Sequence, residues 1–398
     1  MIASLLPTPP SSKRLPAKPH VAPEKVHAFV EDLLAEDVHA RRVLSIGNGV
    51  LGVLHAAALG VHAIGRGLAA ALGLDPKHAI KQVDRLLSNR GVDVWQWFAA
   101  WAKFVVADRK EIAVALDWTH FDADKQATIS LNAITSHGRA TPLVWKTVDA
   151  KLLANRQGEY EREVIERLHE IVPEGVHITV IADRGFGSHA LYEYLALLGW
   201  SFIIRFRQCI VVTTADGRSM PAADWVPVTG HAKMLRGVRV TGDKADVPAV
   251  VLKHQKGMKE AWCLATNRTD LGAAGVVALY GRRFTIEETF RDLKDPRFGM
   301  GLGDIRVSTP VRRDRLIFLF AMAHALLTLL GAAGEAAGLD RTLKANTSKS
   351  RSLSLFKQGA YWFSAIPAMR EDRLAPLMDA FGKALLDHAA FSQIFGVV

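Results

Sequence analysis

Helical spacing of apolar residues dominates the first part of the chain, up to about residue 108. The segment PEKVHAFVEDLLAE opens on Pro23, and proline suits the first turn of a helix. Further along, one apolar helix is predicted to end at Gly73 and a second to begin at Pro76 after a two-residue turn. The pair matches the outline of a helix-turn-helix, and an ordinary antiparallel helix pair with solvated charges matches it equally well.

After residue 108 the spacing changes from helical to extended. We predict three successive strands, in EIAVALDWTHF, QATISLNAITSHG and ATPLVWKTV, and then a helix in EYEREVIERLHEIV. The next run, HITVIA, is apolar without alternation, which is typical of a strand buried on both faces. A helix in HALYEYLALLG and a strand in SFIIRFR follow. This order predicts an α/β fold of the ribonuclease H kind, with a mixed sheet flanked by helices.

Short extended runs between residues 208 and 268 predict a β-rich insertion, after which helical spacing resumes. At 398 residues the chain is too long for one ordinary core. We therefore expect six parts: a flexible Pro-rich basic arm (1–24), a helical domain (25–108), the first part of the core (109–207), the β-strand insertion (208–268), the second part of the core (269–335) and a helical carboxyl-terminal region (336–398).

One segment, LIFLFAMAHALLTLLGAAG at residues 316–334, is almost long and apolar enough to span a bilayer. His324 and Thr328 within it, together with the small residues at its end, favour a buried core helix instead. Near the amino terminus, Pro7 interrupts the sequence before any apolar run reaches signal-peptide length. We therefore expect a cytoplasmic protein that does not enter the membrane.

Composition narrows the class of partner. Lys and Arg outnumber Asp and Glu by 50 to 40, which gives a formal net charge of +10 and favours a polyanion such as RNA, DNA or an anionic membrane. Cys209 and Cys263 are the only cysteines, so the chain cannot build a disulfide framework or a four-cysteine zinc site. A reducing compartment is the simplest expectation.

A dense row of charges, GRRFTIEETFRDLKD, occupies residues 281–295. At about 100° per residue, Tyr280, Arg283, Glu287 and Lys294 fall on one edge of a single predicted helix, beside an apolar stripe that can dock on a core. An exposed Arg283–Glu287 pair alone would stabilise a helix by only about 0.3–0.5 kcal/mol. That pair does not explain a tyrosine and a lysine on the same edge, so we interpret the row as functional.

Two further acids, Asp117 and Asp183, each end a buried apolar run. Ligands bind at the carboxyl ends of the strands in open sheets of this class. Together with Glu287 these acids form a hard oxygen donor set, which suits Mg²⁺ or Mn²⁺. Such a site can hold two metal ions about 3.5–4 Å apart and cleave or join phosphodiesters. The residues therefore predict nuclease and strand-transfer chemistry.

These features resemble the insertion sequence four family of bacterial DDE transposases. Tyr280, Arg283, Glu287 and Lys294, separated by two, three and six residues, reproduce the family's Tyr-Arg-Glu-Lys signature. The segments LDWTHF, ADRGFG, WCLATN and IEETFRDLK with the following GMGL are similar to the family's blocks, in the same order. The resemblance extends from roughly residue 111 to residue 303, and the chain most resembles the cut-and-paste enzymes of composite resistance transposons.

The resemblance implies a catalytic triad of Asp117, Asp183 and Glu287 that holds two Mg²⁺ or Mn²⁺ ions. It also implies that the other signature residues contact the DNA phosphates, namely Tyr280, Arg283 and Lys294. Trp262 is implied to stack a flipped base. A core position in a β subdomain is the alternative for Trp262. Family members cut DNA at terminal inverted repeats, form a hairpin and join the ends to target DNA, and a homodimer pairing two ends is expected.

Further residues are candidates for DNA contacts. Arg184, directly after Asp183, is one candidate. The helix after Pro76 supplies candidate readers of the inverted repeat: Lys77, Lys81, Gln82 and Arg85. Two other functions stay open on the sequence alone. One is a catalytically silent DNA-binding regulator or synaptic scaffold, and the other is a structure-selective nuclease.

Overall fold

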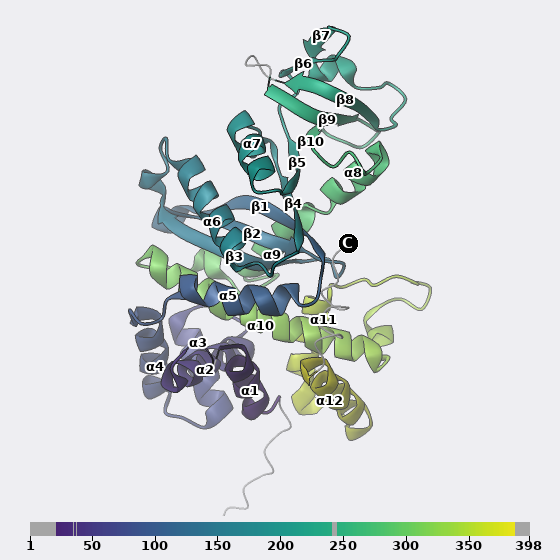
Figure 1. The fold of residues 1–398 in the computed structure, drawn as a ribbon. Coiled ribbons are helices and arrows are strands. Elements are labelled where there is room, and N and C mark those ends of the chain that lie inside the picture. Colours follow the sequence, from purple (N-terminus) through teal and green to yellow (C-terminus); the bar gives the residue numbers. More distant parts are fainter. Residues whose placement is uncertain (1–20, 35, 37, 241–244, 387–398) are drawn as a thin grey trace, which may run out of the picture.

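The computed structural model describes residues 21–34, 36, 38–240 and 245–386. Five helices come first (Figure 1): α1 (Pro23–Leu34), α2 (Ala40–Ala56), α3 (Val61–Leu72), α4 (Pro76–Ser88) and α5 (Val94–Val106). Gly73 ends α3 in the left-handed conformation, with φ 65°, and the Asp75 side chain caps α4 by accepting a hydrogen bond from the His78 backbone N. The predicted ends of this helix pair are confirmed. Most of the predicted basic arm, residues 1–20, lies outside the described residues.

The predicted mixed α/β architecture is confirmed. β1 (Glu111–Phe121), β2 (Gln126–Ile134) and β3 (Ala140–Asp149) pair in antiparallel fashion. β4 (His177–Ala182) and β5 (Ser201–Arg205) then add parallel strands on the other side of β1. Their alternating or continuous apolar residues fill the core, and β4 is buried from its second residue to its last.

The strands after β5 continue the same sheet. They are β6 (Val211–Thr213), β7 (Ser219–Pro221), β8 (Lys233–Val240), β9 (Ala245–Lys253) and β10 (Trp262–Thr266). β10 pairs antiparallel with β5, so the full order is β3-β2-β1-β4-β5-β10-β9-β8-β6-β7. These strands fall within the segment that was predicted to be β-rich, residues 208–268, and Figure 1 shows them extending away from the helical part of the molecule.

Helices cover the sheet and extend beyond it. α6 (Gln157–Ile171) and α7 (His189–Leu197) lie between core strands in sequence, and α8 (Ala273–Gly281) and α9 (Phe284–Lys294) follow the last strand. The carboxyl-terminal part holds α10 (Pro310–Ala336), α11 (Leu355–Ala365) and α12 (Glu371–Leu386). α10 packs against β3, α2, α11 and α12, and therefore joins the sheet to the helices at both ends of the chain (Figure 1).

α10 contains the apolar run at residues 316–334. It is long and apolar enough to cross a membrane, but 94% of its most apolar 18-residue window is buried inside the protein. His324 and Thr328 are fully buried within it, and the Thr328 hydroxyl donates a hydrogen bond to the His324 carbonyl oxygen at 2.7 Å. The prediction of a buried core helix is confirmed.

Two local predictions are wrong. Tyr280 and Lys294 do not share one helix, because α8 ends at Gly281 and α9 begins at Phe284. Between them the backbone hydrogen bonds join residues three apart, as in a 3-10 helix; one example is Arg283 N to Tyr280 O at 2.9 Å. The adjacent Gly281 favours helix only weakly. Asp117 also does not end its strand, since β1 continues to pair with β2 as far as Phe121.

Candidate functional site

Strand register brings Asp117 and Asp183 to the same edge of the sheet. β1 and β4 run parallel, and their pairing ends with Leu116 opposite Ala182. Asp117 and Asp183 are the next residues on these neighbouring strands. Asp183 then caps a short 3-10 turn, where its side chain accepts a hydrogen bond from the Gly185 backbone N at 2.7 Å. The predicted position at the end of β4 is therefore confirmed for Asp183.

α9 carries Glu287 and is held against the sheet by its apolar side. Ile286 is fully buried and Leu293 is almost so, which confirms the predicted apolar stripe. The Thr289 hydroxyl donates to the Ala140 carbonyl oxygen at 2.8 Å and accepts from the Ala140 backbone N at 2.9 Å. These two bonds join the middle of α9 to the first residue of β3, so the position of Glu287 is set by the core and not by a loop.

Arg283 connects two of the three predicted catalytic acids. Its Nη1 lies 3.2 Å from Asp117 Oδ2, and its Nη2 lies 2.5 Å from Glu287 Oε1. The Arg283 side chain is only 8% exposed, whereas the Glu287 side chain is 50% exposed. The pair is therefore not the solvated surface pair that spacing alone would give, because the guanidinium is inserted between helix and sheet.

The environment of Asp117 disfavours its charged form. Burial raises the pKa of Asp117 to about 6, the Arg283 guanidinium opposes this shift, and the negative charges of Asp183 and Glu287 add to it. The Trp118 backbone N donates to Asp117 Oδ1 at 2.9 Å. These charge effects show that the three acids lie within electrostatic range of one another. A positive charge beside Asp117 is therefore favourable.

The chemistry of this donor set fits a hard divalent cation, because it offers carboxylate oxygens. Within the described ranges, however, no group of three or more His, Cys, Asp or Glu side chains stands close enough to hold a metal ion in this arrangement. The Arg283 guanidinium supplies the positive charge at Asp117 and Glu287 instead. A cation could take over that role only if Arg283 turned away.

An aromatic cluster lies beside this charged group. The Trp262 ring on β10 packs edge to face against Tyr280 on α8, with centroids 4.8 Å apart, and it lies 6.2 Å from the Phe284 ring on α9. Tyr280 is buried, and burial raises the pKa of its hydroxyl. Trp262 is only partly buried, and it packs against a cluster of buried residues. Sequence reasoning missed Phe284, whose position inside the signature segment was the available signal.

Lys294 lies apart from the three acids. Its Nζ donates to the His120 carbonyl oxygen at 2.7 Å and lies 3.4 Å from Thr119 Oγ1, farther along β1 than Asp117. Burial lowers the pKa of Lys294. The spacing predicted one edge shared with Arg283, and the structure places the two cations at separate positions along β1.

Arg184 faces the β-rich extension and is already paired. Its Nη1 lies 2.9 Å from Glu260 Oε2, and Arg205 Nη2 lies 2.7 Å from the same oxygen. The nearby Arg184 charge is the main reason that the pKa of Glu260 is lowered. Sequence reasoning did not single out Arg205 or Glu260, because their proximity to Arg184 depends on the pairing of β5 with β10.

The four candidates on α4 form one exposed face. Ala79, Val83, Leu86 and Leu87 are buried against the other amino-terminal helices. The intervening polar side chains are exposed: Lys77, Lys81, Gln82 and Arg85. Figure 1 places α4 among the amino-terminal helices, away from β1 and β4. A nucleic-acid segment would have to be long to reach both α4 and these strands.

Comparison with known protein families finds a match over the middle of the chain. The family described as Transposase DDE domain matches residues 108–326, which is more than half of the 398-residue chain. The matched segment begins just before β1 and ends inside α10, so it includes Asp117, Asp183 and Glu287. No curated protein sequence matches the chain.

Proposed function

This chain belongs to the DDE transposase family, and we propose that it is a cut-and-paste transposase of the insertion sequence four type. It would bind the terminal inverted repeats of its own element, cleave the DNA there through a hairpin intermediate, and join the ends to target DNA. Its place of action would be the bacterial cytoplasm, at the nucleoid. The observation that carries the proposal is the adjacency of Asp117 and Asp183 on parallel strands, with Glu287 linked to Asp117 through Arg283.

DDE transposases use divalent metal ions. In this chain Asp117, Asp183 and Glu287 would hold two such ions, Mg²⁺ or Mn²⁺, which would activate the attacking water or 3′-hydroxyl and stabilise the leaving oxygen. The raised pKa of Asp117 supports this assignment, because a carboxylate in a desolvated acidic group gains most from a nearby cation.

Arg283 would then exchange partners. While it bridges Asp117 and Glu287, it neutralises the acids that would otherwise repel a phosphate. When it turns toward DNA, its planar guanidinium can form paired hydrogen bonds with a phosphate near the scissile bond. Tyr280 and Lys294, the remaining signature residues, would contact the same strand on either side.

Trp262 would support the hairpin step. Closing a hairpin bends the backbone sharply, and a base that leaves the stack is stabilised by stacking on an aromatic ring, typically by about 1–3 kcal/mol. The partly exposed ring of Trp262, backed by Tyr280 and Phe284, offers such a surface. Arg184 would contact the adjoining phosphates.

The helices outside the matched segment would supply recognition and pairing. The exposed face of α4 would read the inverted repeat through Lys77, Lys81, Gln82 and Arg85. The carboxyl-terminal helices α11 and α12 would contribute to a homodimer in which each protomer holds one transposon end.

The direct test uses DNA carrying the imperfect inverted repeats that are expected on either side of the gene. Wild-type protein with Mg²⁺ should nick this DNA and form hairpins, whereas Asp183→Asn should bind it with similar affinity and not cut it. Asp246→Asn is the matched control, because Asp246 is an exposed acid on β9 and the chemical change is the same. Cleavage by Asp183→Asn at the control rate would remove Asp183 from the mechanism.

The same assay separates the two alternatives. A silent regulator or scaffold would bind the repeats and show no Mg²⁺-dependent cleavage by the wild-type protein. A structure-selective nuclease would cut unrelated duplexes as fast as the cognate ends. The transposase proposal requires cleavage that depends on both the metal and the end sequence.

A further inference from the structure

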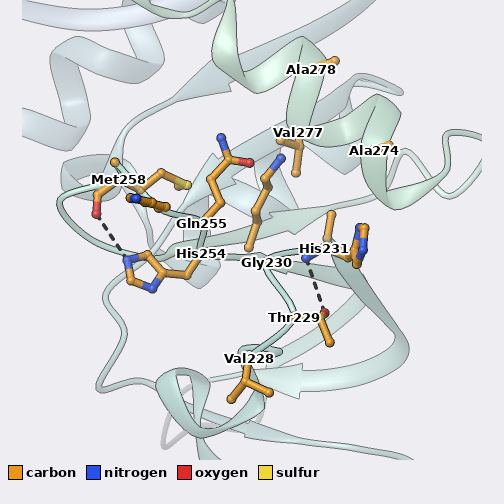
Figure 2. A pocket seen from close by; sticks show the side chains of 14 residues that line it. Val228, Thr229, Gly230, His231, His254, Gln255, Met258, Ala274, Val277 and Ala278 are labelled. Carbon is orange, nitrogen blue, oxygen red and sulfur yellow. Dashed lines mark hydrogen bonds between the residues drawn. The ribbon is translucent and has the colours of Figure 1, made fainter.

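An open cleft lies between two loops of the β-rich extension and α8. Residues 228–232 and 253–258 form its two loop walls, Val277 and Ala278 contribute from α8, and its volume is about 820 Å³. Figure 2 shows the residues of both loops and of α8 that line this space. Volumes of roughly 300–1,000 Å³ are usual for ligand-binding clefts. The cleft is outside the group formed by Asp117, Asp183 and Glu287.

The cleft is basic. Its lining includes Lys253, Lys256, His231 and His254, and none of the fourteen described residues that line it is acidic. Neither lysine takes part in an ion pair among the residues that the structure describes, although most cations around the predicted active site are paired. Two lysines without acidic partners in a concave surface attract an anion.

The walls of the cleft are held in place by local contacts. His254 Nε2 lies within hydrogen-bonding distance of the Met258 carbonyl oxygen, at 3.2 Å (Figure 2). The two loops also come close together, because a β-carbon added to Gly230 would lie 3.7 Å from Gln255 Cβ. Gly257 has φ 93°, a conformation that glycine adopts readily and that lets the second loop turn. The cleft is therefore a formed feature of the fold.

The cleft adjoins the aromatic cluster. Lys253 on β9 is directly opposite Trp262 on β10 in the strand register. Val277, in the wall of the cleft, precedes Tyr280 by about one turn of α8. A strand whose base stacks on Trp262 would therefore have its next phosphates close to Lys253.

A second cleft continues the basic surface toward Asp183. It has a volume of about 730 Å³ and shares Val228 and His254 with the first cleft. Its cationic lining residues are Arg184, Arg205, Arg207 and Lys259, and its one acidic lining residue, Glu260, is paired with Arg184 and Arg205. The two clefts together form a basic path from the neighbour of Asp183 to α8.

We infer that the cleft between residues 228–232, residues 253–258 and α8 binds the phosphodiester backbone of a DNA strand that runs past Trp262. Lys253 and Lys256 would each neutralise one phosphate, while Val277 and Met258 would contact the sugars. This inference deepens the proposed function and rests on it for the identity of the strand. The chemistry of the cleft alone requires an anionic ligand.

Salt dependence tests the inference directly. Fluorescence anisotropy would measure the binding of a fluorescein-labelled DNA duplex, and of one strand of it, to the wild-type protein and to the Lys253→Ala/Lys256→Ala variant at several salt concentrations. Each lost phosphate contact lowers the slope of log K against log salt by about 0.9 for duplex DNA and about 0.7 for a single strand. We therefore expect the slope to fall by about 1.8 or about 1.4, according to the form of DNA that the cleft binds.

Two controls make the result specific. Lys103→Ala/Lys349→Ala removes the same charge from exposed positions outside the proposed DNA and dimer contacts and should leave the slope within experimental error of wild type. Lys253→Arg/Lys256→Arg keeps the charge and should retain the wild-type slope, which excludes misfolding as the cause. Slopes for the cleft and control alanine variants that match each other would overturn the inference. The same variants would also be tested for binding to polyglutamate. If the Lys253→Ala/Lys256→Ala variant lost binding to polyglutamate but bound DNA as the wild type does, the inference would also be wrong, because the cleft would then be a site for acidic protein segments.

Failure of this inference is distinguishable from failure of the proposed function. If the wild-type protein never cleaves DNA but the cleft variant still shows the reduced slope, the cleft binds DNA and the transposase mechanism is wrong. If the wild-type protein cleaves its ends and the cleft variant binds and cleaves them normally, the mechanism stands and the cleft has no role in holding DNA.

Discussion

A buried ion pair on α9 leads to the sharpest prediction about stability. Asp292, five residues after Glu287, is fully buried, and its carboxylate pairs with Nε of Arg139, the residue directly before β3. Lys357 on α11 lies farther away, with its Nζ 3.7 Å from Asp292 Oδ1. The Arg139 side chain is itself only 9% exposed. Replacing Arg139 by methionine keeps much of the side-chain volume and removes the charge.

The expected cost follows from burial. Removing one partner of a buried ion pair costs about 3–5 kcal/mol, because the other charge stays desolvated without compensation. Lys357 remains near Asp292, so we expect Arg139→Met to lower the free energy of unfolding by about 3 kcal/mol at neutral pH, the low end of that range. An exposed pair contributes about 0–1 kcal/mol.

The sign of the pH dependence also follows. Burial raises the pKa of Asp292, and Arg139 opposes that shift, so the pKa of Asp292 rises further in the variant. A carboxyl group whose folded pKa lies above its unfolded value stabilises the fold most at low pH, and this stabilisation is lost as the pH rises through the folded pKa. The deficit of Arg139→Met relative to wild type should therefore be smaller at mildly acidic pH than at neutral pH.

Urea and thermal unfolding of three proteins would check this prediction: wild type, Arg139→Met and Arg291→Met. Arg291 also lies on α9, but its side chain is 43% exposed and pairs with Glu288, which is 38% exposed, so its replacement should cost less than about 1 kcal/mol. Because α9 carries Glu287, Arg139→Met should also lose cleavage activity while Arg291→Met keeps it. Equal stability of the two variants at neutral pH would refute the argument from burial.

Three further predictions concern other parts of the molecule. Gly359→Ala should destabilise the protein by roughly 1–3 kcal/mol or more in thermal unfolding, because a β-carbon there would lie 1.7 Å from the Leu327 carbonyl oxygen. Gly158→Ala is the control and should be neutral or stabilising, because a β-carbon at Gly158 would have nothing within 4 Å. Burial raises the pKa of Asp314 to about 7, so stability should fall as the pH rises from about 4 to 7, and Asp314→Asn should flatten this part of a melting-temperature profile; an unchanged profile would contradict the assignment. Arg283→Ala should raise the pKa of Asp117 above about 6, measurable by carboxyl carbon NMR, and a lower value would show that Arg283 is not its main counter-charge.

Much of the fold could be predicted from local patterns. Apolar alternation and continuous apolar runs identified β1 to β5 and their order, since a strand must place its side chains on two faces of a sheet. Gly73 marked the end of α3 and Pro76 marked the start of α4, because glycine frees the backbone and proline restricts it. The pair Asp117 and Asp183 also followed from this logic, and the parallel register of β1 and β4 places them side by side.

The break between α8 and α9 could not be predicted in the same way. Both helices have good helical spacing across residues 280–294, and the residues of the break keep helical backbone angles. α8 ends beside Gly281, where the backbone hydrogen bonds change from residues four apart to residues three apart. In addition, α8 and α9 pack against different strands. Packing partners that are distant in sequence decided this point.

The sequence by itself determined which residues carry charge, which segments are apolar enough to be buried, and at what spacing the Tyr-Arg-Glu-Lys signature occurs. Only the tertiary structure decided where each charge finds its partner. Arg283 turns inward to Asp117, and Lys294 turns to the His120 carbonyl oxygen. Arg313 on α10 is fully buried and pairs with Asp124. The reason is physical: the energy of a charge depends on its distance to other charges and on its exposure to water, and both are set by contacts between residues far apart in the chain.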